Sequence, residues 1–252
     1  MSSEISRRGV LKGTAATGLL VAGAGTVLAQ PAAAAAAAAP ATGAAAGRAG
    51  ADAAPQPGVR NARTSANGWR MENAVDAGGA VWTRPLPGTT AQLAVRIGQV
   101  ETVLVHLARR YHYEVAELRA EEVAGWRSPE GIRSSALAES NLASGTAVAL
   151  RPGSYPPGVQ GGYFPYELLV IRDILAELDG VVAWGGDDKH VDEGLFYLAV
   201  PPGDARLKAV ADRIRGWSQE PGSGAGTTVD VQAPDRRKAA QRVEQQQRTA
   251  TR

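Results

Sequence analysis

Large apolar side chains recur at helix and strand spacings only between residues 67 and 217, and this feature most constrains the fold. Residues 31–66 are mostly Ala, Gly and Pro, and residues 218–252 are polar and begin with a glycine-rich run. Segments with few large apolar side chains bury too little surface to offset the entropy of ordering. The sequence therefore predicts one folded domain over 67–217, a disordered linker over 31–66 and a disordered polar tail over 218–252.

Length, charge and cysteine content limit the kinds of protein that this domain can be. The segment 67–217 is 151 residues long, which is enough for an ordinary hydrophobic core. It carries 15 basic and 19 acidic side chains, a net charge of −4, whereas the whole chain has a formal charge of +2. The chain has no cysteine and three histidines. These counts exclude a basic nucleic-acid-binding face, a disulfide scaffold, a thiol nucleophile and a cysteine-ligated zinc site.

Hydrophobic periodicity within the domain mixes short strands with amphipathic helices. Strands are expected at 93–97, 146–150, 181–184 and 195–200, and helices at 100–111, 166–178 and 205–217. A further short element is expected at 114–118, an ordered loop at 125–141 and a Pro/Gly-rich loop at 151–163. This mixture predicts a small, single α+β domain, built as an antiparallel sheet with flanking helices.

The first 30 residues resemble a twin-arginine export signal. Arg7 and Arg8 precede a weakly apolar run at 13–28, and Val27-Leu28-Ala29 offers a small-residue cleavage site. The run is shorter than the roughly 20 residues that cross a bilayer as a helix. The resemblance implies export to the periplasm, the cell wall or the extracellular medium, with no stable membrane span once the signal is cleaved. An uncleaved amino-terminal anchor is the alternative.

Two segments of the domain resemble motifs of the zinc D-alanyl-D-alanine carboxypeptidases. Residues 140–149, Ser-Asn-Leu-Ala-Ser-Gly-Thr-Ala-Val-Ala, are similar to that family's S-x-H-x-x-G-x-A-x-D segment. Residues 184–187, Trp-Gly-Gly-Asp, and 192–196, Asp-Glu-Gly-Leu-Phe, are similar to its W-G-G-D and D-x-x-H-F segments. A Pro/Gly loop and one helix separate the motifs, as in the family. The resemblance implies the fold shared with the hedgehog signalling domain and an ancestry in peptidoglycan hydrolysis.

This chain departs from the family at the zinc ligands. The His and Asp of the first motif and the His of the second correspond to Leu142, Ala149 and Leu195. A catalytic zinc ion needs three protein ligands and an open position, and these side chains have no donor atom. An unpaired buried ligand costs about 1–3 kcal/mol, which apolar replacement removes. We therefore expect no cofactor and no zinc catalysis, and a former site turned into core or an apolar pocket floor.

The same resemblance assigns roles to the polar residues that survive. Asp192 corresponds to the family's general base, although it has no metal-bound water to activate. Arg127 and Arg133 precede the first motif, where the family carries an arginine that clamps a substrate carboxylate or carbonyl. The other substrate-binding candidates are Ser140, Asn141, Trp184 and Asp187. Each also has a structural interpretation, as a cap or turn residue, a surface arginine or part of an aromatic core.

Three functions follow as hypotheses. The first is an exported, non-catalytic relative of these peptidases that binds a peptidoglycan stem peptide or an envelope protein. The second is a purely structural or interaction domain on the same scaffold. The third is an active wall peptidase with an unrecognised metal site.

Overall fold

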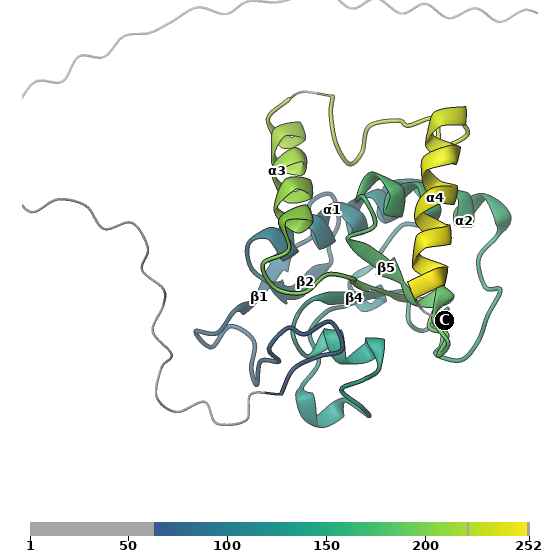
Figure 1. The fold of residues 1–252 in the computed structure, drawn as a ribbon. Coiled ribbons are helices and arrows are strands. Elements are labelled where there is room, and N and C mark those ends of the chain that lie inside the picture. The colour runs from purple at the N-terminus through teal and green to yellow at the C-terminus, as the bar shows by residue number, and fades with distance from the viewer. Residues whose placement is uncertain (1–62, 221, 251–252) are drawn as a thin grey trace, which may run out of the picture. The chain divides into compact units, whose positions relative to one another are not determined.

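The computed structural model describes residues 63–220 and 222–250, so the proposed export signal and most of the linker lie outside the described residues. The described chain has an α+β fold with two antiparallel sheets (Figure 1). The larger sheet has four strands in the order β3-β4-β6-β5, and β1 and β2 form a separate two-stranded sheet. The strands are β1 (Val81–Pro85), β2 (Gln92–Arg96), β3 (Val123–Ala124), β4 (Ala147–Leu150), β5 (Val182–Trp184) and β6 (Leu195–Leu198).

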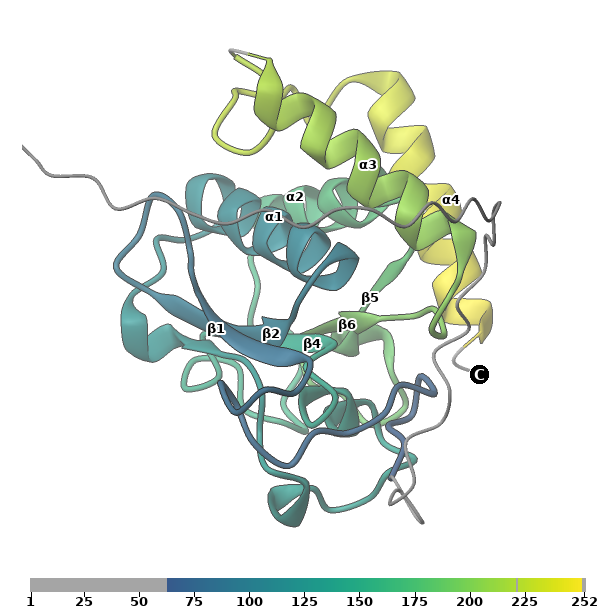
Figure 2. The ribbon, with the colours of Figure 1, turned by 90° about the vertical axis from the view of Figure 1, so that its left-hand side faces the viewer.

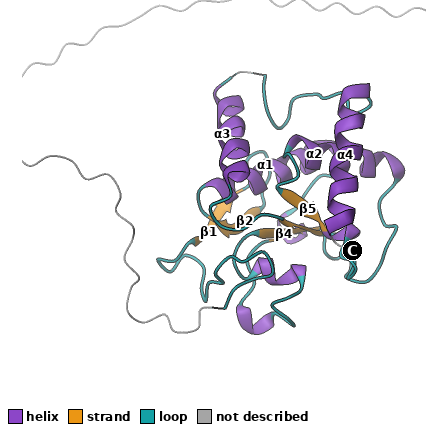
Figure 3. Cartoon of the chain, viewed as in Figure 1, coloured by secondary structure: helices purple, strands orange, loops and turns teal. Residues whose placement is uncertain are grey.

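Four helices accompany these strands (Figure 3): α1 (Gln99–Glu114), α2 (Pro165–Glu177), α3 (Ala205–Gln219) and α4 (Pro234–Ala250). Local sequence sets where they begin. Pro165 occupies the first turn of α2, where a missing N–H costs nothing, and the Glu167 carboxylate accepts from the Phe164 amide at 2.7 Å. The Asp204 side chain caps α3 by accepting from the Arg206 amide at 2.8 Å.

The helices all lie on one side of the larger sheet (Figure 2). Helices α1 and α2 lie next to the sheet, α3 packs on α1, and α4 packs on α2. The opposite face carries irregular loops that include the short 3-10 helices Pro129–Gly131 and Ala138–Leu142. The main core lies between the sheet and the helices, because alternate strand residues point to that side. From β4 and β6 these are Val148, Leu150, Phe196 and Leu198.

The sequence predicted this architecture well. The α+β class, the antiparallel sheet and the helices at 100–111, 166–178 and 205–217 are confirmed, with bounds shifted by a few residues. The strand β1 was not expected, because Val81 is its only fully buried residue and its pattern does not alternate clearly. The segment 114–118 forms no separate element; it completes the end of α1 and leads into a loop.

The predicted domain boundaries are wrong at both ends. At the start, Ser65 is buried within the segment assigned to the linker, and its hydroxyl donates to Ser144 at 2.9 Å. At the end, residues 234–250 form α4 and not a disordered tail. The sequence argument required an apolar stripe for docking, and α4 has little more than Ala240 and Val243.

Helix α4 docks through charge instead. Arg236 donates to both oxygens of Asp173 on α2 at 2.6 Å, and Asp173 is 3% exposed. Near the other end of α4, the Gln247 amide donates to the Val182 carbonyl of the edge strand β5 at 2.7 Å. Within the described residues, no helix is both long and apolar enough to span a bilayer.

Candidate functional site

Strand alternation brings two of the three lost ligand positions to the loop-bearing face of the sheet. In the β4–β6 pairing Ala149 stands directly opposite Leu195. Their neighbours along the strands, Val148 and Phe196, point into the main core on the other face. Ala149 and Leu195 therefore lie side by side on the face that carries the 3-10 helices.

The third position joins them from the 3-10 helix Ala138–Leu142. Leu142, Ala147 and Leu195 form a small apolar cluster of their own, and each is at most 2% exposed. Ala138 and Tyr197 pack against this cluster. Of the three positions that the resemblance assigns to zinc, Leu195 thus lies opposite Ala149 and in one apolar cluster with Leu142, while Ala149 itself is outside that cluster. Among the described residues, no three His, Asp or Glu side chains lie together as a possible metal site.

Two motif glycines permit this convergence. Gly145 has a φ of 68°, and a Cβ there would lie 2.8 Å from the Arg96 amide. A Cβ on Gly185 would lie 2.5 Å from the Asp192 carbonyl. The Gly185 carbonyl accepts from the Asp192 amide at 2.9 Å, so this close approach holds the second motif against the end of β5.

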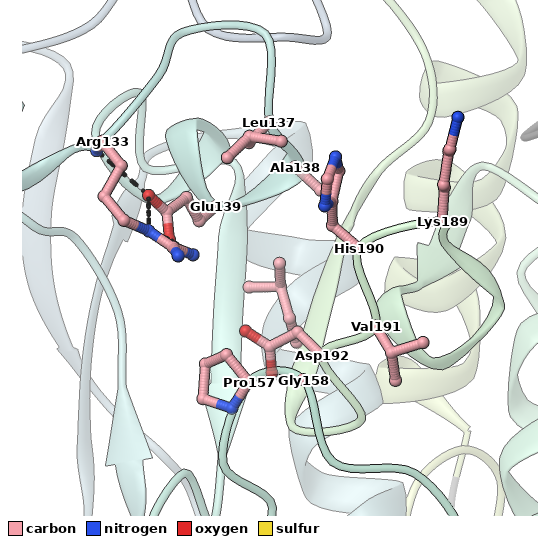
Figure 4. Close-up of a pocket in the computed structure, with 11 residues that line it drawn as sticks. Arg133, Leu137, Ala138, Glu139, Pro157, Gly158, Lys189, His190, Val191 and Asp192 are labelled. Carbon is pink, nitrogen blue, oxygen red and sulfur yellow. Dashed lines mark hydrogen bonds and ion pairs between the residues drawn. The ribbon is translucent and has the colours of Figure 1, made fainter.

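A cavity of about 320 Å³ adjoins the apolar cluster, because Leu195 is one of its lining residues; Figure 4 shows side chains that line it. The other lining residues are Arg133, Leu137, Ala138, Glu139, Pro157, Gly158, Lys189, His190, Val191 and Asp192. We refer to it as the first cavity. Its volume is that of a site for one or two amino-acid residues of a ligand.

The Asp192 carboxylate projects into the first cavity (Figure 4). Burial raises its pKa, a hydrogen bond from the Gly194 amide opposes that rise, and the nearby charge of Glu139 adds to it. The positive charges of Arg127 and Arg133 lower the pKa again. Asp192 is thus a half-buried carboxylate that feels the positive charges of two arginines, and it is placed to accept a hydrogen bond from a ligand.

Arg133 lines the wall opposite Asp192 (Figure 4) and is held there by Glu139. Its Nε and Nη2 donate to the two Glu139 oxygens at 2.7–3.1 Å, and its backbone amide donates to the same carboxylate at 3.0 Å. The hydrogen bond from the Arg133 side chain lowers the pKa of Glu139. The fixed guanidinium fork keeps further N–H donors for a ligand oxygen. Arg127 is exposed and does not line the cavity.

Ser140 and Asn141 are fully buried and anchor the chain. The Ser140 hydroxyl accepts from the Ala66 amide at 2.8 Å and donates to the Ser135 carbonyl at 3.0 Å. The Asn141 Oδ1 accepts from the Asn67 amide at 3.2 Å. Neither side chain lines the first cavity, and both tie residues 66 and 67 to the first motif. Asn141 lines a second cavity that is described below.

Trp184 and Asp187 also lie away from the first cavity. The Trp184 indole donates to the Glu193 carbonyl at 2.7 Å, and the Arg172 guanidinium sits 4.9 Å from the centre of its ring. Arg172 also pairs with the Asp187 carboxylate, which is 5% exposed. The Trp-Gly-Gly-Asp segment therefore connects the sheet to α2 through Arg172, and neither Trp184 nor Asp187 reaches the first cavity.

Sequence reasoning missed a buried carboxylate that shapes the cavity wall. Glu193 is 4% exposed, and its two oxygens accept from the amides of Gly161 and Gly162 at 2.8 Å each. These bonds hold the Pro/Gly loop whose residues Pro157 and Gly158 line the cavity. The sequence does contain the two parts of this contact, an acid next to Asp192 and two adjacent glycines in the Pro/Gly loop. Glu139, Lys189 and His190 were missed as well, since no motif position marks them.

Comparison with known proteins gives no match: no family model, no curated protein and no solved structure is similar to this chain. The resemblance to the zinc carboxypeptidases therefore rests on the two motifs and on where the fold places them.

Proposed function

We propose that the chain is an exported, non-catalytic relative of the peptidoglycan D-Ala-D-Ala carboxypeptidases, and that its first cavity binds a wall stem peptide. One observation carries this proposal. Of the positions chosen from the sequence as the erased ligands, Leu195 pairs with Ala149 across the sheet and packs in one apolar cluster with Leu142. A zinc site needs its ligands close together, and the strand pairing and the shared cluster give these positions that closeness.

The first cavity supplies groups that suit a peptide. Arg133 offers N–H donors to a carboxylate or a peptide carbonyl, and Asp192 offers an acceptor to an amide or an ammonium group. Leu137, Ala138 and Leu195 offer an apolar surface for small side chains. Binding without hydrolysis follows, because Asp192 has no metal-bound water to activate.

Co-sedimentation of the full chain with isolated peptidoglycan tests the proposal, with a D-Ala-D-Ala-terminated peptide as competitor. We expect the chain to sediment, the peptide to release it, and Asp192→Asn to weaken the binding. Asp212→Asn is the matched control, because Asp212 lies on the exposed face of α3 in surface ion pairs. Sedimentation that ignores both the competitor and Asp192→Asn would overturn the proposal.

A purely structural domain is the second candidate, and the packing of Leu142 and Leu195 favours it. Both are nearly fully buried, so part of the former site is filled. If this candidate holds, the chain stays in the supernatant at every peptidoglycan concentration. The third hypothesis, an active peptidase, has no possible metal site among the described residues.

A further inference from the structure

A second cavity, of about 380 Å³, lies behind the first. Leu137, Ala138, Lys189 and His190 line both cavities and so form the partition between them. The other residues that line the second cavity are Ala66, Asn67, Ala136, Asn141, Ala183, Asp188, Tyr197, Leu198, Ala199, Gln247 and Ala250. Of the residues to which the resemblance assigns a role, Asn141 lines this cavity.

Among the described residues, Asp188 is the one carboxylate that lines the second cavity, which Lys189 and His190 line as well. Its carboxylate is half-buried and accepts from the Tyr197 hydroxyl at 2.7 Å. No Lys, Arg or His of the described residues forms an ion pair with it, although its neighbour Asp187 pairs with Arg172. Burial raises the pKa of Asp188, and the hydrogen bond from Tyr197 opposes that rise. The charges of Asp187 and Asp192 raise the pKa further, and that of His190 lowers it. A carboxylate in this position gains from a cation that arrives with a ligand.

Asn141 provides a hydrogen-bond donor without a partner. It has no exposed surface, and its Nδ2 makes no hydrogen bond with any described residue. Its orientation is fixed, because Oδ1 accepts from the Asn67 backbone amide, which only donates. An unpaired buried amide costs free energy that a ligand acceptor recovers. This nitrogen has almost no accessible surface, so a ligand acceptor reaches it only with a shift of the cavity wall.

The remaining wall fits a small, cationic ligand. Ala183, Leu198 and Ala199 present small apolar side chains, which leave room for a short aliphatic body and not for a long one. Ala250, the last residue of α4, also lines the cavity. The carbonyl end of a helix carries partial negative charge, which adds to the field of Asp188.

We propose that the second cavity binds the amino-terminal residue of a peptide. The α-ammonium group pairs with the Asp188 carboxylate, the first peptide carbonyl accepts from Asn141 Nδ2, and a small side chain lies against Ala183 and Leu198. This site is separate from the first cavity and does not depend on the proposed function, since it uses neither Arg133 nor Asp192.

Titration of the full chain with alaninamide at neutral pH, followed by calorimetry, tests this site. Alaninamide carries the ammonium group and the carbonyl, and propionamide has the same carbonyl without the ammonium group. We expect saturable binding of alaninamide and none of propionamide. We expect Asp188→Asn, which keeps the shape and removes the charge, to weaken alaninamide binding by about tenfold or more.

The Asp192→Asn variant shows which cavity holds the probe. Unchanged alaninamide binding in this variant supports the second cavity, and its loss places the ligand in the first cavity and overturns the proposal. The proposal is also overturned if alaninamide does not bind, or if a folded Asp188→Asn variant, checked by circular dichroism, binds it as tightly as the unaltered chain. Peptidoglycan binding is measured separately, so either result stands without the other.

Discussion

Replacing Arg236 with alanine should remove much of the stability that the docking of α4 gives to the domain. Arg236 makes two bonds of 2.6 Å to Asp173 and one of 3.1 Å to Glu177. Breaking a fully buried ion pair costs about 3–5 kcal/mol, and an exposed pair contributes about 0–1 kcal/mol. The Asp173 side chain is 3% exposed and that of Arg236 is 28% exposed, so the pair lies between these limits. Asp173 also keeps Arg110 as a partner at 3.0 Å after the change.

We therefore expect Arg236→Ala to lower the free energy of unfolding by about 2–3 kcal/mol, or Tm by roughly 4–12 °C. Urea unfolding of the full chain measures this difference, with the slope of the transition compared between variants. Arg237→Ala is the matched control, because Arg237 is exposed and forms no ion pair with a described residue. We expect the control to lie within about 0.5 kcal/mol of the unaltered chain.

Two outcomes would refute this reasoning. If Arg236→Ala and Arg237→Ala lose the same stability, α4 is not held by the buried carboxylates. If about 1 M salt removes the difference between them, the pair is exposed to solvent and screened, contrary to the burial of Asp173. A persistent difference at high salt supports a buried electrostatic contact.

Two further predictions concern single carboxylates. Burial opposes ionisation of Glu177, but the His106 hydrogen bond and the Arg110 charge prevail and lower its pKa from 4.5 to about 2. Because the pKa is lower in the folded chain, Glu177 stabilises the fold above pH 4.5 and this contribution, about 3 kcal/mol, is lost as the pH falls toward 2. Acid unfolding curves should lose this component in Glu177→Gln, and equal pH dependence in both chains would contradict it. Glu193→Gln should weaken the hydrogen bonds from the amides of residues 161 and 162, so that hydrogen exchange at these amides becomes faster. Glu117→Gln is the control, because Glu117 is exposed, and it should leave the exchange unchanged. Unaltered protection in Glu193→Gln would show that Glu193 does not hold the loop.

Sequence periodicity was enough for most of the fold, because the main core follows simple spacing rules. Alternation at 147–150 and 195–198 sorts Val148 and Phe196 into the main core, and helical spacing marks the inner face of α2. These spacing rules did not predict helix α4, since its docking depends on partners such as Asp173 that lie about 60 residues away in the sequence. Pairing of distant charges leaves no periodic signal in one sequence.

Only part of the candidate site could be predicted, because the motifs give the spacing of residues and not the direction of their side chains. Motif spacing grouped Leu142, Ala149 and Leu195, and the structure places Leu195 opposite Ala149 and in contact with Leu142, because strand register carries sequence spacing directly into space for the two strand positions. Motif spacing does not say which side chains point into a cavity. Trp184 and Asp187 turn toward α2, whereas Glu139 and His190, which belong to no motif position, line the cavity walls.

Restoring the three ligands tests the central claim, that this fold holds an erased zinc site. The variant combines Leu142→His, Ala149→Asp and Leu195→His in the full chain, and the same chain without Ala149→Asp serves as a two-ligand control. We expect the triple variant to take up about one zinc ion per chain by equilibrium dialysis and to gain Tm with added zinc, and the control to do neither. A triple variant that folds, as judged by circular dichroism, and yet binds no more zinc than the control would contradict the account.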